Sequence, residues 1–437
     1  MKKRFIYLVS YLMLLSVFIL SHSQRSQANE SDYDWIDNAD GTVTITNYKS
    51  SSTDVTIPDT LGGKTVTVIG RDVFMDKKLT SVILPSSLTS IGSHAFATYN
   101  YSIRPKSIAL PSSLTSIGSN AFTNARLDSI TLPSGLTSIG SGAFAANNLK
   151  SVTLPSSLTY LGDSAFSINK LTSVMLPSNL KYIGMETFGG NRLTSITLPS
   201  SLTHISHKAF VNNQLKDITL PSGLIGIGNF AFMSNELTSV TLPSSLSNIG
   251  GSAFSYNPLT SVTVLNDATV IETSAFSSDR NAPDFTIVGH SLSTAHTLAD
   301  NKGYLFKPIT YKVIYDGNGN TGGNVPVDSN TYKRQTPVTA LDNNTDQLIK
   351  TGYTFDGWNT LVDGTGVDYA VNSTFQMGEA DVTLYAKWKV NSPVIYKWID
   401  NPDGTVTIKD YIGSSKDVII PDTLGGKTVY NYGVLEY

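Results

Sequence analysis

The chain has 437 residues, long enough for about two to four domains, with a net charge of −3 and only 15% charged residues. This weak, balanced charge gives no electrostatic reason to expect binding to nucleic acid or anionic membranes. Cysteine is absent, which excludes disulfides, thiolate zinc ligands, thiol nucleophiles and a lipid-modified cysteine anchor.

Residues 1–28 have the features of a signal peptide. Lys2-Lys3-Arg4 is a positive start, residues 5–20 are apolar, and Ser26-Gln27-Ala28 offers small residues for cleavage. The alternative is an uncleaved anchor helix, but the apolar stretch is short for a span of about 20 residues. We therefore expect cleavage before Asn29, secretion, and no membrane insertion of the mature protein.

Residues 29–56 are predicted to form a hairpin that caps the array following it. Asp40-Gly41 is typical of a tight turn and stands between the strand-like stretches Trp35-Ile36 and 43–45. A cap here would shield the open end of the array from edge-to-edge pairing.

Residues 57–310 are dominated by a repeating unit. Its phenylalanines recur every 22 residues, except for one step of 26 after Phe96. They are Phe74, Phe96, Phe122, Phe144, Phe166, Phe188, Phe210, Phe232, Phe254 and Phe276. A period of this size, with leucines at fixed offsets, predicts a solenoid of roughly ten coils. One coil cannot bury its own apolar face, so stacked coils must form the core.

Each coil is predicted to contain two short extended pieces and a turn. In residues 149–170, the first strand spans 151–154 and ends at Pro155, because proline lacks the N–H that a ladder needs. The second piece turns its leucines inward. A turn then places Phe166 in the interior.

Two recurring positions, one glycine and one asparagine, are predicted to shape or bond the main chain. Glycine recurs at the position of Gly162, which predicts a turn with positive φ. Asparagine recurs in a tight loop and is expected to bond main-chain groups of its own and neighbouring coils. The column is Asn147, Asn169, Asn191, Asn213, Asn235 and Asn257.

The array is predicted to close with a short helix. Ser291 is a candidate N-cap, and Gly303 stands just past the expected end. Residues 304–306 are then expected to return as a strand.

The recurring string LxxVxLPxxLxxIGxxAFxxN, over roughly residues 54–310, resembles the BspA-type leucine-rich repeat of bacterial surface proteins. This resemblance implies a right-handed solenoid, secretion, and binding to host or neighbouring-cell proteins. The strings 352–358 and 383–388 resemble the internalin-type B-repeat, or Listeria–Bacteroides repeat. That implies a small β-grasp-like module at 311–390, with Trp358 and Trp388 in its core.

The end of the chain repeats its beginning. Residues 398–429 match residues 35–66 at most positions, so residues 391–437 are expected to start a second repeat array. Our hypothesis from the sequence is that this array is truncated.

No arrangement of residues predicts an enzyme. Acidic residues are scattered, and the serines belong to the repeat, so no nucleophile and base are brought together. His204 and His207 are the one close histidine pair, without a third ligand nearby. We expect no catalysis, metal or cofactor.

Two departures from the repeat are candidate binding residues. One column changes from serine to rings on three consecutive coils: Tyr160, Tyr182 and His204. With coils about 5 Å apart, these rings would form a contiguous strip. The coil of 26 residues adds a loop with Tyr99, Tyr101 and Arg104. Stacking between neighbouring coils, or a tolerated insertion, would explain the same residues structurally.

We therefore expect a predominantly β protein of the cell surface or extracellular space. Its repeat array would bind a protein or glycan of host or neighbouring cells, and no nucleic acid. The alternative is a structural stalk or spacer in a larger surface protein. A targeting domain of an enzyme has no residue in its favour.

Overall fold

The computed structural model describes residues 29–99, 106–277, 284–343, 348–390, 396–412 and 420–432. The expected signal peptide lies outside the described residues. The chain divides into two compact units, Met1–Pro308 and Ile309–Tyr437. Among the described residues, no helix has the length and hydropathy that crossing a membrane requires.

The first unit opens with a cap. It comprises η1 (Glu30–Asp32), β1 (Tyr33–Asp37), β2 (Val43–Tyr48), β3 (Asp54–Thr56), β4 (Thr60–Leu61) and β5 (Lys64–Ile69). β1 and β2 pair as the expected antiparallel hairpin, and Gly41 in its turn has a φ of 82°. β5 runs parallel to β2 and presents its other edge to the first coil.

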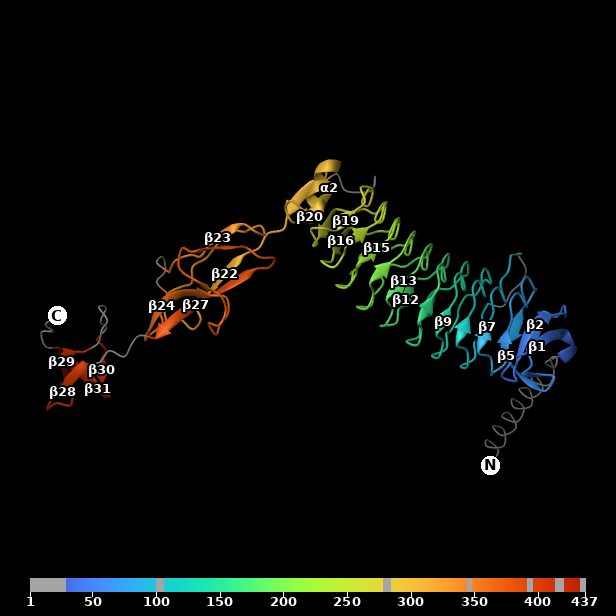
Figure 1. Ribbon diagram of the computed structural model, residues 1–437, viewed down its shortest axis with the longest axis horizontal. Coiled ribbons are helices and arrows are strands. Elements are labelled where there is room, and N and C mark those ends of the chain that lie inside the picture. Colours follow the sequence, from blue (N-terminus) through green and yellow to red (C-terminus); the bar gives the residue numbers. More distant parts are fainter. Residues whose placement is uncertain are drawn as a thin grey trace, which may run out of the picture. The chain divides into compact units, whose positions relative to one another are not determined.

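The coils contribute short strands that pair in parallel with the same strands of neighbouring coils (Figure 1). Strands of the first set, formed by the first extended piece of a coil, are β6 (Ser81–Ile83), β10 (Ser151–Thr153), β12 (Ser173–Met175), β16 (Ser239–Leu242) and β18 (Ser261–Val264). The second set is β7 (Ser90–Ile91), β8 (Ser116–Ile117), β9 (Ser138–Ile139), β11 (Tyr160–Leu161), β13 (Tyr182–Ile183), β14 (His204–Ile205), β15 (Gly226–Ile227), β17 (Asn248–Ile249) and β19 (Val270–Ile271). This confirms the solenoid. The second extended piece forms a strand in every coil from β7 to β19, whereas the first piece forms none in the coils at 107–110, 129–132, 195–198 and 217–220.

The phenylalanine column forms one continuous stack of rings. Neighbouring rings from Phe74 to Phe276 are stacked with centroids 5.1 to 6.1 Å apart. The widest step, 6.1 Å, joins Phe166 and Phe188. Because truncating such a ring typically costs about 3–5 kcal/mol, the column fixes the register of the coils.

The asparagine column bonds the main chain as predicted. The Asn169 side chain accepts a hydrogen bond from the Leu149 N–H at 3.1 Å. Its amide donates to the carbonyls of Phe144 at 2.8 Å and Phe166 at 3.2 Å. The buried amide therefore links main-chain groups of two coils, and the Phe166 carbonyl is shared by two asparagines because it also accepts from Asn191 at 3.0 Å.

The prediction of positive φ at the glycine column is wrong. Gly162 and its equivalents lie outside the positive-φ region, which is occupied by Ser164 (56°) and Ile168 (54°) in the same coil. Glycine is needed there for closeness, because a Cβ on Gly162 would lie 2.3 Å from the Ser141 nitrogen of the preceding coil.

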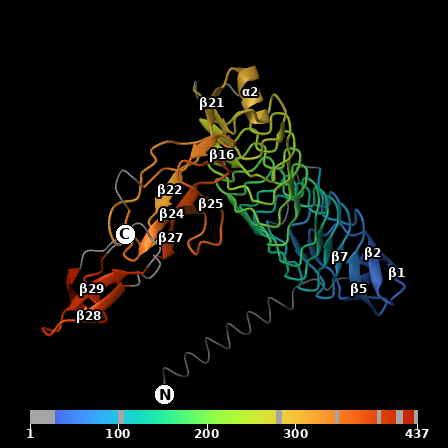
Figure 2. The ribbon, with the colours of Figure 1, turned by 60° about the vertical axis from the view of Figure 1, so that its left-hand side comes forward.

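A helix closes the far end of the array (Figure 2). α2 (Thr294–Lys302) lies between β20 (Thr286–Gly289) and β21 (Leu305–Pro308). Its N-cap is Ser293 and not Ser291, because the Ser293 hydroxyl accepts from His296 N–H at 3.2 Å. Gly303 ends it in the left-handed conformation, as expected.

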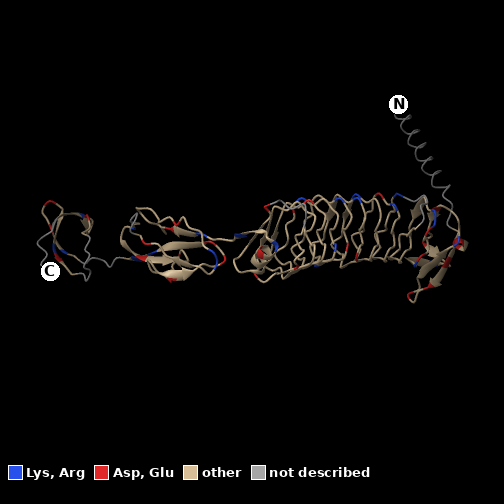
Figure 3. Ribbon diagram, turned by 90° about the horizontal axis from the view of Figure 1, so that it is seen from above, with Lys and Arg blue, Asp and Glu red and all other residues tan. Residues whose placement is uncertain are grey.

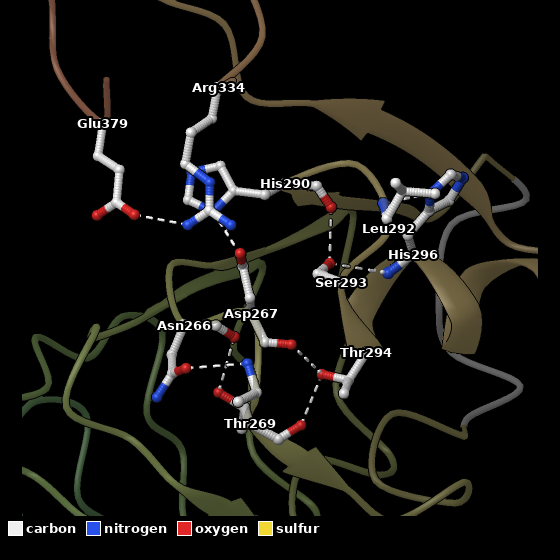
Figure 4. Close-up of polar contacts among 11 residues, drawn as sticks. Asn266, Asp267, Thr269, His290, Leu292, Ser293, Thr294, His296, Arg334 and Glu379 are labelled. Atoms are coloured by element: carbon white, nitrogen blue, oxygen red, sulfur yellow. Dashed lines mark hydrogen bonds and ion pairs between the residues drawn. The ribbon is translucent and has the colours of Figure 1, made fainter. Parts of the chain in front are cut away.

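Hydrogen bonds tie α2 to the last coil (Figure 4). The Thr294 hydroxyl donates to the carbonyls of Asp267 at 3.1 Å and Thr269 at 2.7 Å. The Asp267 carboxylate also lies 2.6 Å from the His290 ring. The helix also buries Ala295, Leu298 and Ala299 in the hydrophobic core, so apolar contacts and these polar bonds together close the array.

The second unit begins with a small β module. Its strands are β22 (Val313–Asp316), β23 (Pro337–Thr339), β24 (Tyr353–Asn359), β25 (Asp368–Tyr369), β26 (Thr374–Gln376) and β27 (Val382–Val390). Trp358 is fully buried and donates to the Leu341 carbonyl at 2.8 Å. Trp388 packs partly buried against the same core.

A four-stranded sheet follows in the order β28-β29-β31-β30. These strands are β28 (Tyr396–Asp400), β29 (Val406–Tyr411), β30 (Thr423–Leu424) and β31 (Lys427–Tyr432). Its sequence is the one that repeats the first cap.

Candidate functional site

The predicted ring residues lie in one column on the surface of the array. Tyr160, Tyr182 and His204 each begin a strand of the second set, β11, β13 and β14. Tyr182 aligns with His204, and Tyr160 aligns with Ser138 of the preceding coil. The two tyrosines are 54% and 49% exposed, so their ring faces are available to solvent.

The parallel ladder is interrupted inside this column. One sheet ends at β11 and a separate sheet begins at β13, whereas the neighbouring coils pair without a break. We call this interruption the open junction. Elsewhere the ladder continues through main-chain bonds such as Gly162 N–H to Ile139 O at 2.8 Å and Ser206 N–H to Ile183 O at 2.9 Å.

The coils separate on this face alone. On the face of the first strands, Leu154 N–H still donates to Met175 O at 3.0 Å. On the face of the turns, Ser164 N–H donates to Met185 O at 2.7 Å. At the far edge of the open junction, the Asp163 carboxylate accepts from the Met185 N–H at 2.7 Å. The opening is therefore wedge-shaped, and hydrogen bonds between the two coils close it on the face of the first strands and on the face of the turns.

The wedge forms a cleft of about 530 Å³. This volume is within the range of small-molecule sites, about 300–1,000 Å³. Its lining comes from two consecutive coils: Leu158, Thr159, Tyr160, Leu161, Gly162, Asp163, Asn179, Leu180, Lys181 and Tyr182. The two exposed tyrosines of the strip thus stand at the same cleft.

Two substitutions in the repeat distinguish this junction from the next one. At the next junction, the hydroxyl of Ser201 donates to Leu180 O at 2.7 Å and that of Thr203 donates to Lys181 O at 3.0 Å. The open junction has Asn179 and Lys181 at those two positions. Neither side chain can make the short hydroxyl bond, so the two carbonyls below lose their side-chain partners.

The cleft offers mixed polar chemistry beside its rings. Asp163 and Lys181 supply one carboxylate and one ammonium on opposite walls, and both side chains are exposed. Asn179 adds an amide that donates to Ser156 O at 3.3 Å. Lys, Arg, Asp and Glu residues are few along the stacked coils (Figure 3), and the cleft lining includes one residue of each sign, Asp163 and Lys181.

The other candidate residues are not brought to this cleft. Tyr99 is 57% exposed and its N–H donates to Asp76 at 2.6 Å, in a coil that precedes Tyr160 by three. Tyr101 and Arg104 lie outside the described residues. His204 continues the column one coil beyond Tyr182 and does not line the cleft.

Asp163, Asn179 and Lys181 escaped the sequence analysis. Each replaces the serine or threonine that the preceding coil has at its position, so departures from the small polar columns were the available signal. Within the described ranges, no three His, Asp or Glu side chains gather to hold a metal ion.

Two repeat families match this chain. The BspA type leucine rich repeat region matches residues 67–189 and 161–283, and the Listeria-Bacteroides repeat domain matches residues 311–387. A putative Gly-rich membrane protein of Evansella cellulosilytica is 44% identical over 127 residues, which are 24% of this chain and 14% of that protein. The chain thus spans a small part of that relative.

Solved structures share the solenoid. A leucine-rich repeat protein from Bacteroides ovatus is 23% identical with a TM-score of 0.50, covering 65% of this chain and 84% of that one. A leucine rich cell surface protein from Faecalibacterium prausnitzii is 25% identical with a TM-score of 0.41, covering 67% and 83%. The first likeness supports the fold and nothing further.

Proposed function

Because this chain carries a BspA-type leucine-rich repeat region followed by a Listeria-Bacteroides repeat domain, as bacterial surface proteins do, we propose that it is a secreted recognition protein of the cell surface. It acts without catalysis, by binding a macromolecule of a host or neighbouring cell through its repeat array. The module of residues 311–390 serves as a spacer or second contact.

The open junction is the observation that carries this proposal. A uniform stalk has no use for an interrupted ladder, which forgoes main-chain bonds worth about 0.5–1.5 kcal/mol each. Here the interruption coincides with two half-exposed tyrosines and a cleft of about 530 Å³. Exposed aromatic side chains at a concave, partly polar site are typical of ligand binding.

The geometry favours a saccharide ring over an added peptide strand. A peptide that extends a sheet needs a long edge and about 4.8 Å to each neighbouring strand. β11 and β13 are only two residues long, and the Asp163–Met185 bond of 2.7 Å holds their ends together. A flat ring with hydroxyl groups can instead pack on the tyrosines and bond Asp163, Asn179 and Lys181.

Binding of the purified chain from Asn29 to a panel of glycans, mucins and matrix proteins tests the proposal. The variant Tyr160→Ser/Tyr182→Ser restores the residue that earlier coils have in this column, Ser138 for example. We expect saturable binding of a glycan, weakened more than tenfold in the variant because each lost aromatic anchor removes more than about 1 kcal/mol.

Tyr256→Ser is the matched control. Tyr256 is 48% exposed on another coil, and the equivalent residue one coil earlier is Ser234, with nearly the same φ. This control should bind like the wild type. No binding by the well-folded wild type would favour the stalk, whereas a protein ligand that the tyrosine variant still binds would place recognition elsewhere on the chain.

A further inference from the structure

Four consecutive coils each carry one cation beside the leucine that opens the coil. These leucines are fully buried, and the residues before and after them face outward: they are Leu149, Leu171, Leu193 and Leu215. Four of the eight flanking residues are Asn, Thr or Gln, and none is acidic. The other four, which we call the basic ridge, are Lys150, Lys170, Arg192 and Lys216.

The cations of the basic ridge are exposed and lack an acidic partner. Within the described ranges, none of the four forms an ion pair, whereas Lys208 on the turns of the same coils contacts Glu186 at 3.1 Å. Asp217 is the one acidic residue next to a ridge cation in the chain. Asp128 and Glu236 take flanking positions in the coils before and after, so the ridge ends at both sides.

Main-chain bonds fix the spacing of the basic ridge. Lys170 N–H donates to Leu149 O at 3.0 Å, and Arg192 N–H donates to Leu171 O at 2.9 Å. Bonded neighbours lie about 4.8 Å apart, so three steps span about 14 Å. Figure 3 shows Lys and Arg segments along one edge of the stacked coils.

Ile168 adds an exposed apolar side chain two residues before Lys170. It is 66% exposed and has a φ of 54°, a region that β-branched residues rarely adopt. The neighbouring coils have the small residues Ala146 and Gly190 in this column, so Ile168 stands above them. Backbone strain of this kind is found chiefly at residues that serve a contact with a ligand or partner.

We propose that the basic ridge and Ile168 bind a linear acidic polysaccharide, which carries a carboxylate or sulfate on successive sugars. Its acidic groups pair with the cations of successive coils, and Ile168 packs on the apolar face of a sugar ring. The whole chain carries a charge of −3, so the attraction is local, within a Debye length of about 8 Å. This inference depends on neither the open junction nor its ligand.

The ridge fits a polysaccharide better than a peptide or a membrane. Side chains on one face of an extended peptide repeat about every 6.6 Å, out of step with the coils. The ridge amides are already bonded to neighbouring coils, so no strand can add there. A flat anionic membrane would also meet Asp128 and Glu236 at the two ends of the ridge.

The affinity of the purified chain from Asn29 for polygalacturonate and for dextran sulfate tests the proposal, with neutral dextran as the reference polymer. The ridge variant is Lys150→Gln/Lys170→Gln/Arg192→Gln. The matched control removes the same charge from exposed lysines away from the ridge: Lys307→Gln/Lys312→Gln/Lys389→Gln. We expect salt-dependent binding of both acidic polymers, weakened at least about tenfold in the ridge variant and unchanged in the control.

Ile168→Asn separates a role in binding from a role in folding. Asn124 and Asn212 hold the same column position with φ values of 56° and 54°, and asparagine tolerates this conformation. We expect a higher melting temperature together with about fivefold weaker binding of the acidic polymers. The variant Tyr160→Ser/Tyr182→Ser should bind them like the wild type, because the cleft is a separate site.

Four results would overturn the proposal. They are equal losses in the ridge variant and its control, wild-type binding by Ile168→Asn, loss of binding in the tyrosine variant, and equal binding of neutral dextran. Poly-glutamate or phosphatidylglycerol vesicles that bind the ridge more tightly than either acidic polysaccharide would equally reject a polysaccharide as the partner.

Discussion

The open junction and the junction after it differ in two side chains rather than in the repeat plan. Between β13 and β14, bulky Tyr182 and His204 are neighbours, and the ladder is intact. The hydroxyls of Ser201 and Thr203 hold those coils together. Between β11 and β13, equally bulky rings are neighbours, but Asn179 and Lys181 stand in place of the hydroxyls.

A third junction separates the effect of the missing hydroxyls from the effect of the bulky rings. Between β14 and β15, Gly223 and Ile225 also lack the hydroxyls, yet the ladder stays closed. Here the column residue is Gly226, which leaves room for the coils to approach. The comparison indicates that missing hydroxyls open a junction only when bulky rings also push the two coils apart.

The largest predicted effect concerns the glycine column on either side of the cleft. A Cβ on Gly162 would meet backbone atoms at 2.3 Å, whereas one on Gly184 would meet the Asp163 side chain at 2.4 Å. A side chain can move and a packed backbone cannot. We expect Gly162→Ala to lower the free energy of unfolding by about 3 kcal/mol and Gly184→Ala by about 1 kcal/mol.

Urea unfolding followed by circular dichroism measures both values, with Tyr256→Ser as a surface control. Equal losses for the two glycines would mean that the coils approach each other as closely at the cleft as elsewhere, and the open junction would be disproved.

Restoring the hydroxyls should close the cleft. Asn179→Ser with Lys181→Thr returns the two residues that the following coil has, and allows bonds to the carbonyls of Leu158 and Thr159. At about 0.5–1.5 kcal/mol for each bond, we expect a gain of about 1–2 kcal/mol in unfolding free energy. Ligand binding should fall although both tyrosines remain.

Thermal unfolding and the glycan panel together check this prediction. A stabilised variant that still binds the ligand would show that the tyrosines suffice and that the opening itself is dispensable.

The smallest effect is local and needs no mutation. The amide of Ser206 donates to Ile183 O at 2.9 Å, while its counterpart Gly184 lies at the interrupted ladder. One main-chain bond of about 1 kcal/mol corresponds to roughly fivefold in exchange rate. Hydrogen exchange by mass spectrometry should therefore find residue 184 exchanging at least that much faster. Equal rates would indicate that the junction is closed in solution.

The features that recur in every repeat could be predicted from the sequence. The phenylalanine stack, the inward leucines and the bonds of the asparagine column follow from periodicity, because every coil confirms the same assignment. The reason for the glycine column was missed, since a positive φ and a close approach both select glycine. Ser293 rather than Ser291 caps α2, because helix starts are set by local geometry that two nearby serines do not distinguish.

The cleft could be predicted only in part. Tyr160 and Tyr182 stood out as large residues in a column of small ones. The separation of the coils also requires the loss of two hydroxyl bonds at Asn179 and Lys181, beside these rings. A threonine-to-lysine change on an exposed strand gives no sign, in sequence alone, of the bond that it removes.

The asparagines and phenylalanines contact only neighbouring coils. This restricts bonding to adjacent repeats and affects how the gene can gain or lose repeat units. Each Asn amide reaches one coil back, and each ring stacks on the next, so a deletion or duplication of one repeat unit leaves a complete set of contacts. Recombination between near-identical repeats can therefore alter the length of the array, by about 4.8 Å per coil, without leaving an unbonded asparagine or an unstacked ring. The coils of Tyr160 and Tyr182 are the exceptions, because the loss of either would erase one wall of the cleft along with the repeat.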